Sequence, residues 1–163
     1  MPHLGRDRFQ SIAMLDAFIR HPFMSRAGAA ALTPHAFVEA MCRVERALAR
    51  VQERAGLLPA GTSAAIETQL KVDAFDLDRL GTETADGGNV AIPFVKQAKA
   101  LLADELRDYF HVGAPSQDIL DTALMLVLRP RLEQILVRLG ESRLNGVALM
   151  HRHAQTPMIG RTL

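Results

Sequence analysis

The sequence has 163 residues, of which 48% are hydrophobic and 23% are charged, a composition that excludes a disordered chain. Only 5% of the residues are aromatic, whereas Ala, Leu and Arg, which favour helices, are plentiful. We therefore expect an all-α fold rather than an all-β one. The net charge of +1 creates no field that would attract nucleic acid or an anionic membrane.

Cysteine usage and hydropathy predict a cytoplasmic protein. Cys42 is the single cysteine, so an internal disulfide is excluded and a reducing compartment is favoured. No run approaches the roughly 18 apolar residues of a membrane span, and the N-terminus has no signal-peptide pattern. We expect neither nucleic-acid nor membrane partners.

Residues 9–23 have a loosely helical pattern that ends at Pro22. The next predicted helix has Thr33 as its N-cap and Pro34 as its first residue, and it ends near Gly56. Its apolar face is formed at three- and four-residue spacing by Phe37, Met41, Val44, Leu48 and Val51.

The segment from residue 60 to 115 predicts short helices and two loops. A helix begins at Thr62–Ser63, and residues 73–80 are compatible with another. Residues 82–89 predict a loop because they end in Gly-Gly-Asn, and Pro93 opens a helix that runs to about Leu106. Residues 109–115 predict the second loop.

A long helix is predicted from Ser116, as N-cap, to about His153. Pro130 would kink it or mark a short irregularity. About 36 helical residues give a rod of about 54 Å, whose apolar stripe requires helices from outside this chain. We therefore expect the chain to self-associate.

The residues alone indicate neither a metal site nor a phosphate-binding loop. His151 and His153 would point about 200° apart on a helix, Cys42 lacks a second thiolate, and Gly87-Gly88 lacks a flanking strand and Lys. The N–H groups at the start of the long helix, with Ser116 and Gln117, could receive a carboxylate, although Ser116 could equally be a cap alone. Arg161 is a candidate carboxylate clamp, or simply a solvated arginine.

Several segments resemble those of a known family. Residues 111–123 resemble the His-x-Gly-x-Thr-Ser-Gln-Asp-x-x-Asp-Thr-Ala signature of the aspartase/fumarase superfamily, and residues 160–162 look like its Gly-Arg-Thr motif. Residues 88–96 resemble the Gly-Asn-x-x-Ile-Pro-Leu-Val-Lys segment of its carboxymuconate cycloisomerase branch, and residues 45–49 and 56–59 resemble the first long helix and its exit. Pro115 departs from the usual Thr. Leu163 agrees with the cycloisomerases, because adenylosuccinate lyases carry a catalytic histidine there.

The resemblance implies a fold, an assembly and a reaction. Residues 1–110 would form a helical N-terminal domain, and residues 111–163 the first long helix of a bundle shared by a homotetramer. The chain would be the N-terminal portion of such an enzyme, with the rest of the bundle and the C-terminal domain absent. The implied reaction interconverts 3-carboxy-cis,cis-muconate and a carboxymuconolactone in aromatic degradation, with a small di- or tricarboxylate substrate and no cofactor.

The resemblance also implies site residues. Those expected to bind substrate are Ser116, Gln117, Arg161, Thr162, His111 and Asn89. The general base of the family is a serine in a Gly-Ser-Ser loop that would lie beyond Leu163, so the catalytic residue is unassigned and this chain alone is expected to be inactive. Two alternatives remain open: another superfamily lyase, such as an adenylosuccinate-lyase-like enzyme, and a non-catalytic helical interaction module.

Overall fold

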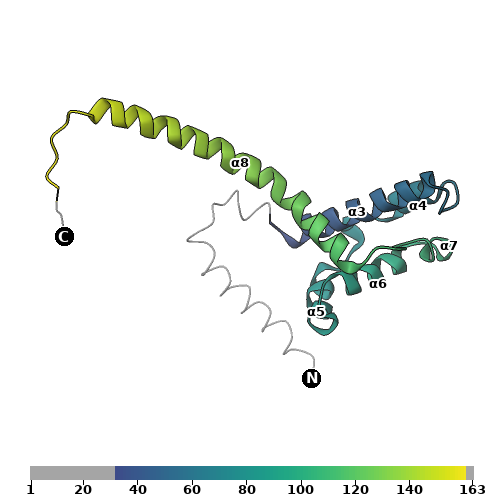
Figure 1. Ribbon diagram of the computed structural model, residues 1–163. Helices are drawn as coiled ribbons and strands as arrows, with labels where there is room; N and C mark the ends of the chain where they lie inside the picture. The colour runs from purple at the N-terminus through teal and green to yellow at the C-terminus, as the bar shows by residue number, and fades with distance from the viewer. Residues whose placement is uncertain (1–31, 161–163) are drawn as a thin grey trace, which may run out of the picture. The chain divides into compact units, whose positions relative to one another are not determined.

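The computed structural model describes residues 32–160, and Figure 1 shows that every regular element among them is helical. The predicted all-α fold is confirmed. The predicted helix at residues 9–23 lies outside the described residues. The elements are α3 (Pro34–Arg54), α4 (Thr62–Gln69), the 3₁₀ turn η1 (Val72–Ala74), α5 (Leu77–Gly87), α6 (Ala91–Leu101), α7 (Asp104–Arg107) and α8 (Ser116–His153).

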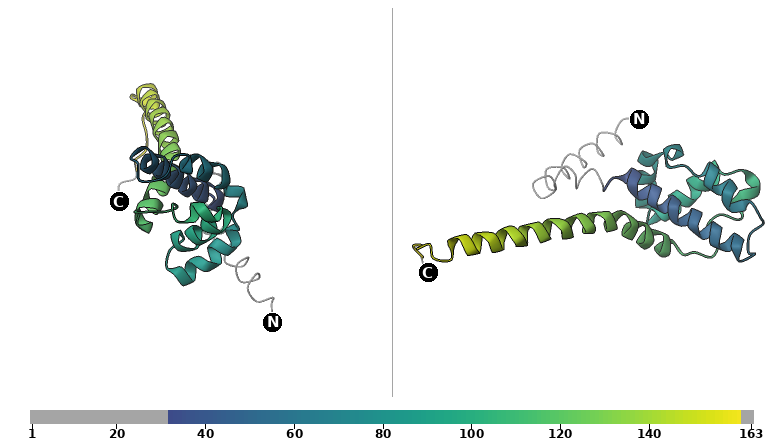
Figure 2. Two further views of the ribbon diagram at one scale, coloured as in Figure 1. Left: turned by 90° about the vertical axis from the view of Figure 1, so that its right-hand side faces the viewer. Right: turned by 90° about the horizontal axis from the view of Figure 1, so that it is seen from above.

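The described residues belong to two compact units, one ending at Val127 and the other beginning at Leu128. The first contains α3 to α7 and the first turns of α8, and Figure 2 shows these helices gathered together. Its fully buried side chains come from α3, α4, α6, α8 and the connecting segments. The rings of Phe75 and Phe94 stack within this core, with centroids 5.1 Å apart.

The helix α3 begins as predicted. Thr33 is its N-cap, and the Thr33 hydroxyl oxygen accepts a hydrogen bond from the Ala36 N–H at 3.1 Å. Ala55 is the C-cap, and Gly56 follows with φ +74°, a left-handed conformation that costs glycine little. The predicted start of α4 at Thr62 is also confirmed.

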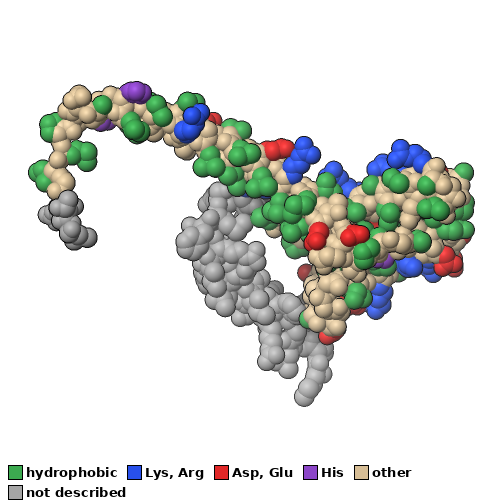
Figure 3. Space-filling view, in the orientation of Figure 1, with side chains coloured by type: hydrophobic (Ala, Val, Ile, Leu, Met, Phe, Trp, Pro, Cys, Tyr) green, Lys and Arg blue, Asp and Glu red, His purple; other side chains and the backbone are tan. Residues whose placement is uncertain are grey.

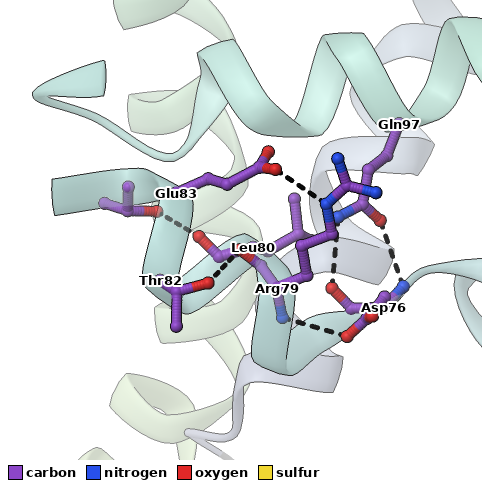
Figure 4. Close-up of polar contacts among 7 residues, drawn as sticks. Asp76, Arg79, Leu80, Thr82, Glu83 and Gln97 are labelled. Carbon is purple, nitrogen blue, oxygen red and sulfur yellow. Dashed lines mark hydrogen bonds and ion pairs between the residues drawn. The ribbon is translucent and has the colours of Figure 1, made fainter. Parts of the chain in front are cut away.

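The prediction of a loop over residues 82–89 is wrong, because α5 continues to Gly87. Figure 4 shows how the polar residues are accommodated: the Thr82 hydroxyl donates to the Arg79 carbonyl at 2.9 Å, so it needs no partner outside the helix. The Thr84 hydroxyl does the same to the Leu80 carbonyl at 2.7 Å. The helix ends only at Gly88, whose φ is +75°.

The helix predicted from Pro93 to about Leu106 is interrupted. It begins at Ala91 and ends at Leu101, and α7 is a separate turn. The backbone of Leu102 is extended, with ψ 146°. We attribute this conformation to burial of the Leu102 side chain in the core, where 1% of its surface is exposed. The Arg107 guanidinium then donates to the Lys99 and Leu102 carbonyls, which have lost their helical partners.

In the second unit, α8 continues through Pro130 without interruption. The predicted helix bounds of Ser116 and about His153 are confirmed. Large apolar side chains of this unit are exposed, and Figure 3 shows hydrophobic side chains along this part of the helix: Leu132, Ile135, Leu136, Val137, Leu139, Leu144, Val147, Leu149 and Met150. None of the helices within residues 32–160 combines the length and apolarity that crossing a membrane requires.

Candidate functional site

The signature loop, residues 110–115, lies between α7 and α8 and has two residues in the left-handed backbone region. His111 has φ +60° and Gly113 has φ +73°. A non-glycine residue in this region costs about 1–2 kcal/mol and persists where surrounding contacts hold it. The loop is therefore fixed by its neighbours rather than by its own preference.

The first of these contacts joins the loop to α3 through a buried carboxylate. Nδ1 of His111 lies 2.6 Å from Oε1 of Glu45. Glu45 is 2% exposed, whereas the His111 side chain keeps 17% of its surface accessible. An acidic side chain this deeply buried requires a polar or charged partner, and His111 supplies it.

A second contact holds the backbone of the same loop. Nε2 of Gln52 donates to the Val112 carbonyl at 2.7 Å. Glu45 and Gln52 lie seven residues apart on α3 and therefore share one face of that helix. Oε1 of Gln52 is buried without a hydrogen-bond partner among the described residues. One face of α3 thus holds both a side chain and a carbonyl of the signature loop.

Ser116 and Gln117 lie at the start of α8, but the prediction that Ser116 is the N-cap is wrong. Ser116 is the first helical residue, and Pro115 precedes the helix. The Pro115 carbonyl accepts a hydrogen bond from the Asp118 N–H at 3.1 Å. The exposed Gln117 amide donates to Oδ1 of Asp121 at 2.6 Å. Both residues adjoin the signature loop and the unpaired N–H groups of the first turn.

Asn89 has a local structural contact. Its Oδ1 accepts from the Ala91 N–H at 3.0 Å and so satisfies one free donor at the start of α6. No hydrogen bond within residues 32–160 joins Asn89 to the signature loop. The other two predicted site residues, Arg161 and Thr162, lie outside the described residues. The structure therefore brings together His111, Ser116 and Gln117 along one short segment.

A groove between α3 and the first turns of α8 is lined by Arg43, Arg46 and Arg50 of α3 and by Thr122 and Leu126 of α8, and none of the predicted site residues that the structure describes lines it. Two of the arginines have acidic partners: Arg46 with Glu39 and Arg50 with Glu67 at 3.8 Å. These ion pairs partly neutralise the positive charge of the groove. Across residues 32–160, no three His, Cys, Asp or Glu side chains gather where they could hold a metal ion.

Glu45 and Gln52 were not among the predicted site residues. One signal could have identified Glu45: it lies four residues after Met41 and three before Leu48, within the predicted apolar face. A charged residue at such a position needs a buried partner. Gln52 gives no such signal, because its contact depends on how a loop 60 residues later folds back.

Comparison with known proteins finds similar enzymes, although no protein-family model matches the sequence. A 3-carboxy-cis,cis-muconate cycloisomerase of Pseudomonas putida is 42% identical over 130 residues, which cover 77% of this chain and 30% of that protein. A nitrosuccinate lyase of Streptomyces davaonensis is 37% identical over 93% of this chain and 33% of its own length. The crystal structure of the 3-carboxy-cis,cis-muconate lactonizing enzyme from Pseudomonas putida matches with a TM-score of 0.81 and 34% identity, over 90% of this chain and 34% of that one.

The all-helical fold, with a long helix beginning at the signature loop, is the N-terminal architecture that these enzymes share with this chain. The chain belongs to the aspartase/fumarase superfamily, which confirms the resemblance seen in its motifs. Several of the relatives it matches are 3-carboxy-cis,cis-muconate cycloisomerases. The chain spans about a third of the length of these relatives.

Proposed function

We propose that this chain supplies the N-terminal part of a cycloisomerase that interconverts 3-carboxy-cis,cis-muconate and a carboxymuconolactone. The observation that supports this most is the signature loop, which leads directly into the first turn of α8 and carries His111 beside Ser116 and Gln117. Its similarity to the cycloisomerases supports a small di- or tricarboxylate as the substrate class.

The proposed chemistry requires donors for negative charge rather than a cofactor. In the forward direction a carboxylate oxygen of the muconate adds to one end of a carbon–carbon double bond, and a proton adds to the other end. In reverse, a base removes that proton from the carbon next to a carboxylate, and charge accumulates on the carboxylate oxygens. Fixed N–H and O–H donors stabilise such charge, and we assign this role to the first turn of α8, Ser116, Arg161 and Thr162.

We further propose that the functional protein is a homotetramer in the cytoplasm. Nine large apolar side chains of α8 between Leu132 and Met150 are exposed. Full burial of such a side chain contributes about 1.5–3 kcal/mol. These side chains are 43% to 73% exposed, so each would contribute part of that amount, which favours association with equivalent helices. As part of this proposal, residues 1–110 form the N-terminal domain and residues 111–163 contribute to the shared bundle.

A second candidate follows from the similarity to nitrosuccinate lyase, which covers 93% of this chain. A lyase and a cycloisomerase of this kind would share the same carboxylate donors and differ in what leaves or adds at the neighbouring carbon.

The test uses a chimera that adds the part of the cycloisomerase, about two thirds of its length, that has no counterpart in this chain. Residues 1–163 are fused to the remainder of the Pseudomonas putida cycloisomerase, and loss of the conjugated diene's ultraviolet absorbance is followed with 3-carboxy-cis,cis-muconate. We expect turnover by the chimera and none by residues 1–163 alone. A folded, tetrameric chimera that does not convert this substrate would refute the proposal. Conversion of nitrosuccinate alone would favour the second candidate.

A further inference from the structure

The contact between Glu45 and His111 determines which ring nitrogen of the histidine can act on a ligand. An ionised Glu45 carboxylate can only accept a hydrogen bond, and in that state the contact of 2.6 Å between Oε1 and Nδ1 requires the proton on Nδ1. Nε2 is then the nitrogen that remains free to accept or to donate. For an ionised Glu45, the same contact both orients the ring and selects its tautomer.

The setting of this pair differs from that of an ordinary surface ion pair. Only 1% of the Glu45 side chain is exposed, so solvent neither screens nor replaces the contact. His35 and Asp73 form a comparable pair at 3.2 Å, but their side chains are 53% and 89% exposed. Exposed pairs of that kind hold their geometry weakly. The His35–Asp73 pair therefore serves as a surface reference, within the same chain, for the buried pair of His111 and Glu45.

The backbone supports the same conclusion. His111 has φ +60°, and the carbonyl of the next residue is held by Gln52 from the same face of α3. Two side chains of one helix therefore act on consecutive residues of the loop, Glu45 on the imidazole and Gln52 on the peptide group. Of the two, only Glu45 can determine where the ring proton lies.

We propose that Glu45 is a positioning residue that holds His111 with its proton on Nδ1 and presents Nε2 to the substrate of the candidate site. The inference rests on the proposed function only for the identity of that substrate, a small carboxylate. Proton exchange by His111 then takes place at Nε2, the nitrogen directed away from Glu45. The neutral ring accepts there, and the imidazolium donates there to a carboxylate while Glu45 balances its charge.

The first test is spectroscopic and needs no enzyme activity. Residues 1–163 are labelled with ¹⁵N in their histidine rings, and the tautomer of His111, assigned with the variant His111→Gln, is measured above its titration. We expect the Nδ1–H form in the unmodified chain and loss of that preference in Glu45→Gln, where the amide can also donate to Nδ1. The ring of His35 and the matched variant Gln52→Ala, which removes only the backbone contact, should show no change of tautomer.

An Nε2–H ring in the unmodified chain would overturn the proposal, and this measurement does not depend on whether any variant folds. In the active chimera, Glu45→Gln should lower kcat by about tenfold, since losing the group that orients a functional histidine costs 10–100-fold in metal sites. Unchanged kcat in that variant would overturn the positioning role. An inactive unmodified chimera with an Nδ1–H ring would instead refute the proposed function and leave the Glu45–His111 geometry supported.

Discussion

The Glu53 carboxylate, in the last turn of α3, accepts a hydrogen bond from the Ser63 N–H at the start of α4, at 2.6 Å. It also accepts one from the Gly61 N–H at 2.9 Å. One side chain thus joins the end of one helix to the beginning of the next and satisfies donors that α4 leaves unpaired.

The first prediction concerns acid stability. The Ser63 hydroxyl, with the N–H groups of Gly61 and Ser63, holds the pKa of Glu53 below its ordinary value. A lowered folded-state pKa contributes stability at neutral pH, and this contribution is lost as the pH falls from about 5 through the ordinary value near 4.3 and then through the lowered one. Glu53→Gln should therefore lower the urea midpoint at pH 7 but change it less at pH 3. An equal loss at both pH values would contradict the account.

The second prediction concerns Cys42. Burial, followed by the nearby Glu39 carboxylate, raises the pKa of its thiol to about 12. Almost no thiolate is present at pH 8, and the side chain is fully buried. A thiol reagent should react with Cys42 only as fast as the chain unfolds, so the rate should rise steeply in urea. Rapid reaction of the native chain would show that α3 is not packed as described.

The third prediction compares two neighbouring glycines. Gly88 has φ +75° at the C-terminal end of α5, so Gly88→Ala should lower the free energy of unfolding by about 1–2 kcal/mol. In Gly87→Ala, the added Cβ would meet the Ile92 side chain at an ordinary 3.5 Å, and alanine favours the helix. That variant should be neutral or stabilising. If thermal unfolding showed the same loss of stability in both variants, the assignment of Gly88 as the C-cap of α5 would be contradicted.

The fourth prediction concerns assembly. Leu136 is 68% exposed, on the apolar part of α8 that we expect to pack against other subunits. Light scattering should show residues 1–163 as an oligomer at micromolar concentration and Leu136→Glu as a smaller species. Gln134→Glu, which adds the same charge at an exposed polar position, should keep the oligomer. A stable monomer of the unmodified chain would refute the prediction.

The sequence predicts those features that depend on local chemistry. The start of α3 follows from Thr33 and Pro34, and the bounds of α8 follow from its apolar spacing. The end of α5 was missed because Gly87-Gly88-Asn89 indicated a loop, whereas Gly87 is still helical and the Thr82 and Thr84 hydroxyls bond within the helix. The end of α6 was missed because burial of Leu102, a tertiary effect, overrides helical propensity there.

The residues of the candidate site remain predictions, and the structure adds how one of them is oriented. The signature motif gave His111, Ser116 and Gln117, which adjoin each other because they are close in sequence. The orientation of the His111 ring depends on Glu45, which lies 66 residues away in the sequence, and the Val112 carbonyl beside it is held by Gln52, which lies 60 residues away. Spacing along the chain carries no information about contacts of this kind until the loop is folded against α3.

The fifth prediction tests the donor role proposed above for Ser116 and Thr162, and with it our further proposal that the two residues reach one carboxylate from different subunits. Ser116 is the first of the 38 residues of α8, and Thr162 follows the last of them in the sequence. Because a helix of this length keeps its two ends far apart, we expect the two residues to meet only between chains. In the active chimera, Ser116→Ala and Thr162→Val should each lower turnover of 3-carboxy-cis,cis-muconate by about 10²–10³, the typical cost of losing one such donor. Circular dichroism should show unchanged helix content.

The most direct measurement is the turnover rate after the two single variants are co-expressed. Mixed tetramers contain some sites with both donors intact, so the rate should rise well above that of either variant alone. A co-expressed mixture no faster than the average of the two variants, or single variants as fast as the unmodified chimera, would contradict the shared carboxylate site.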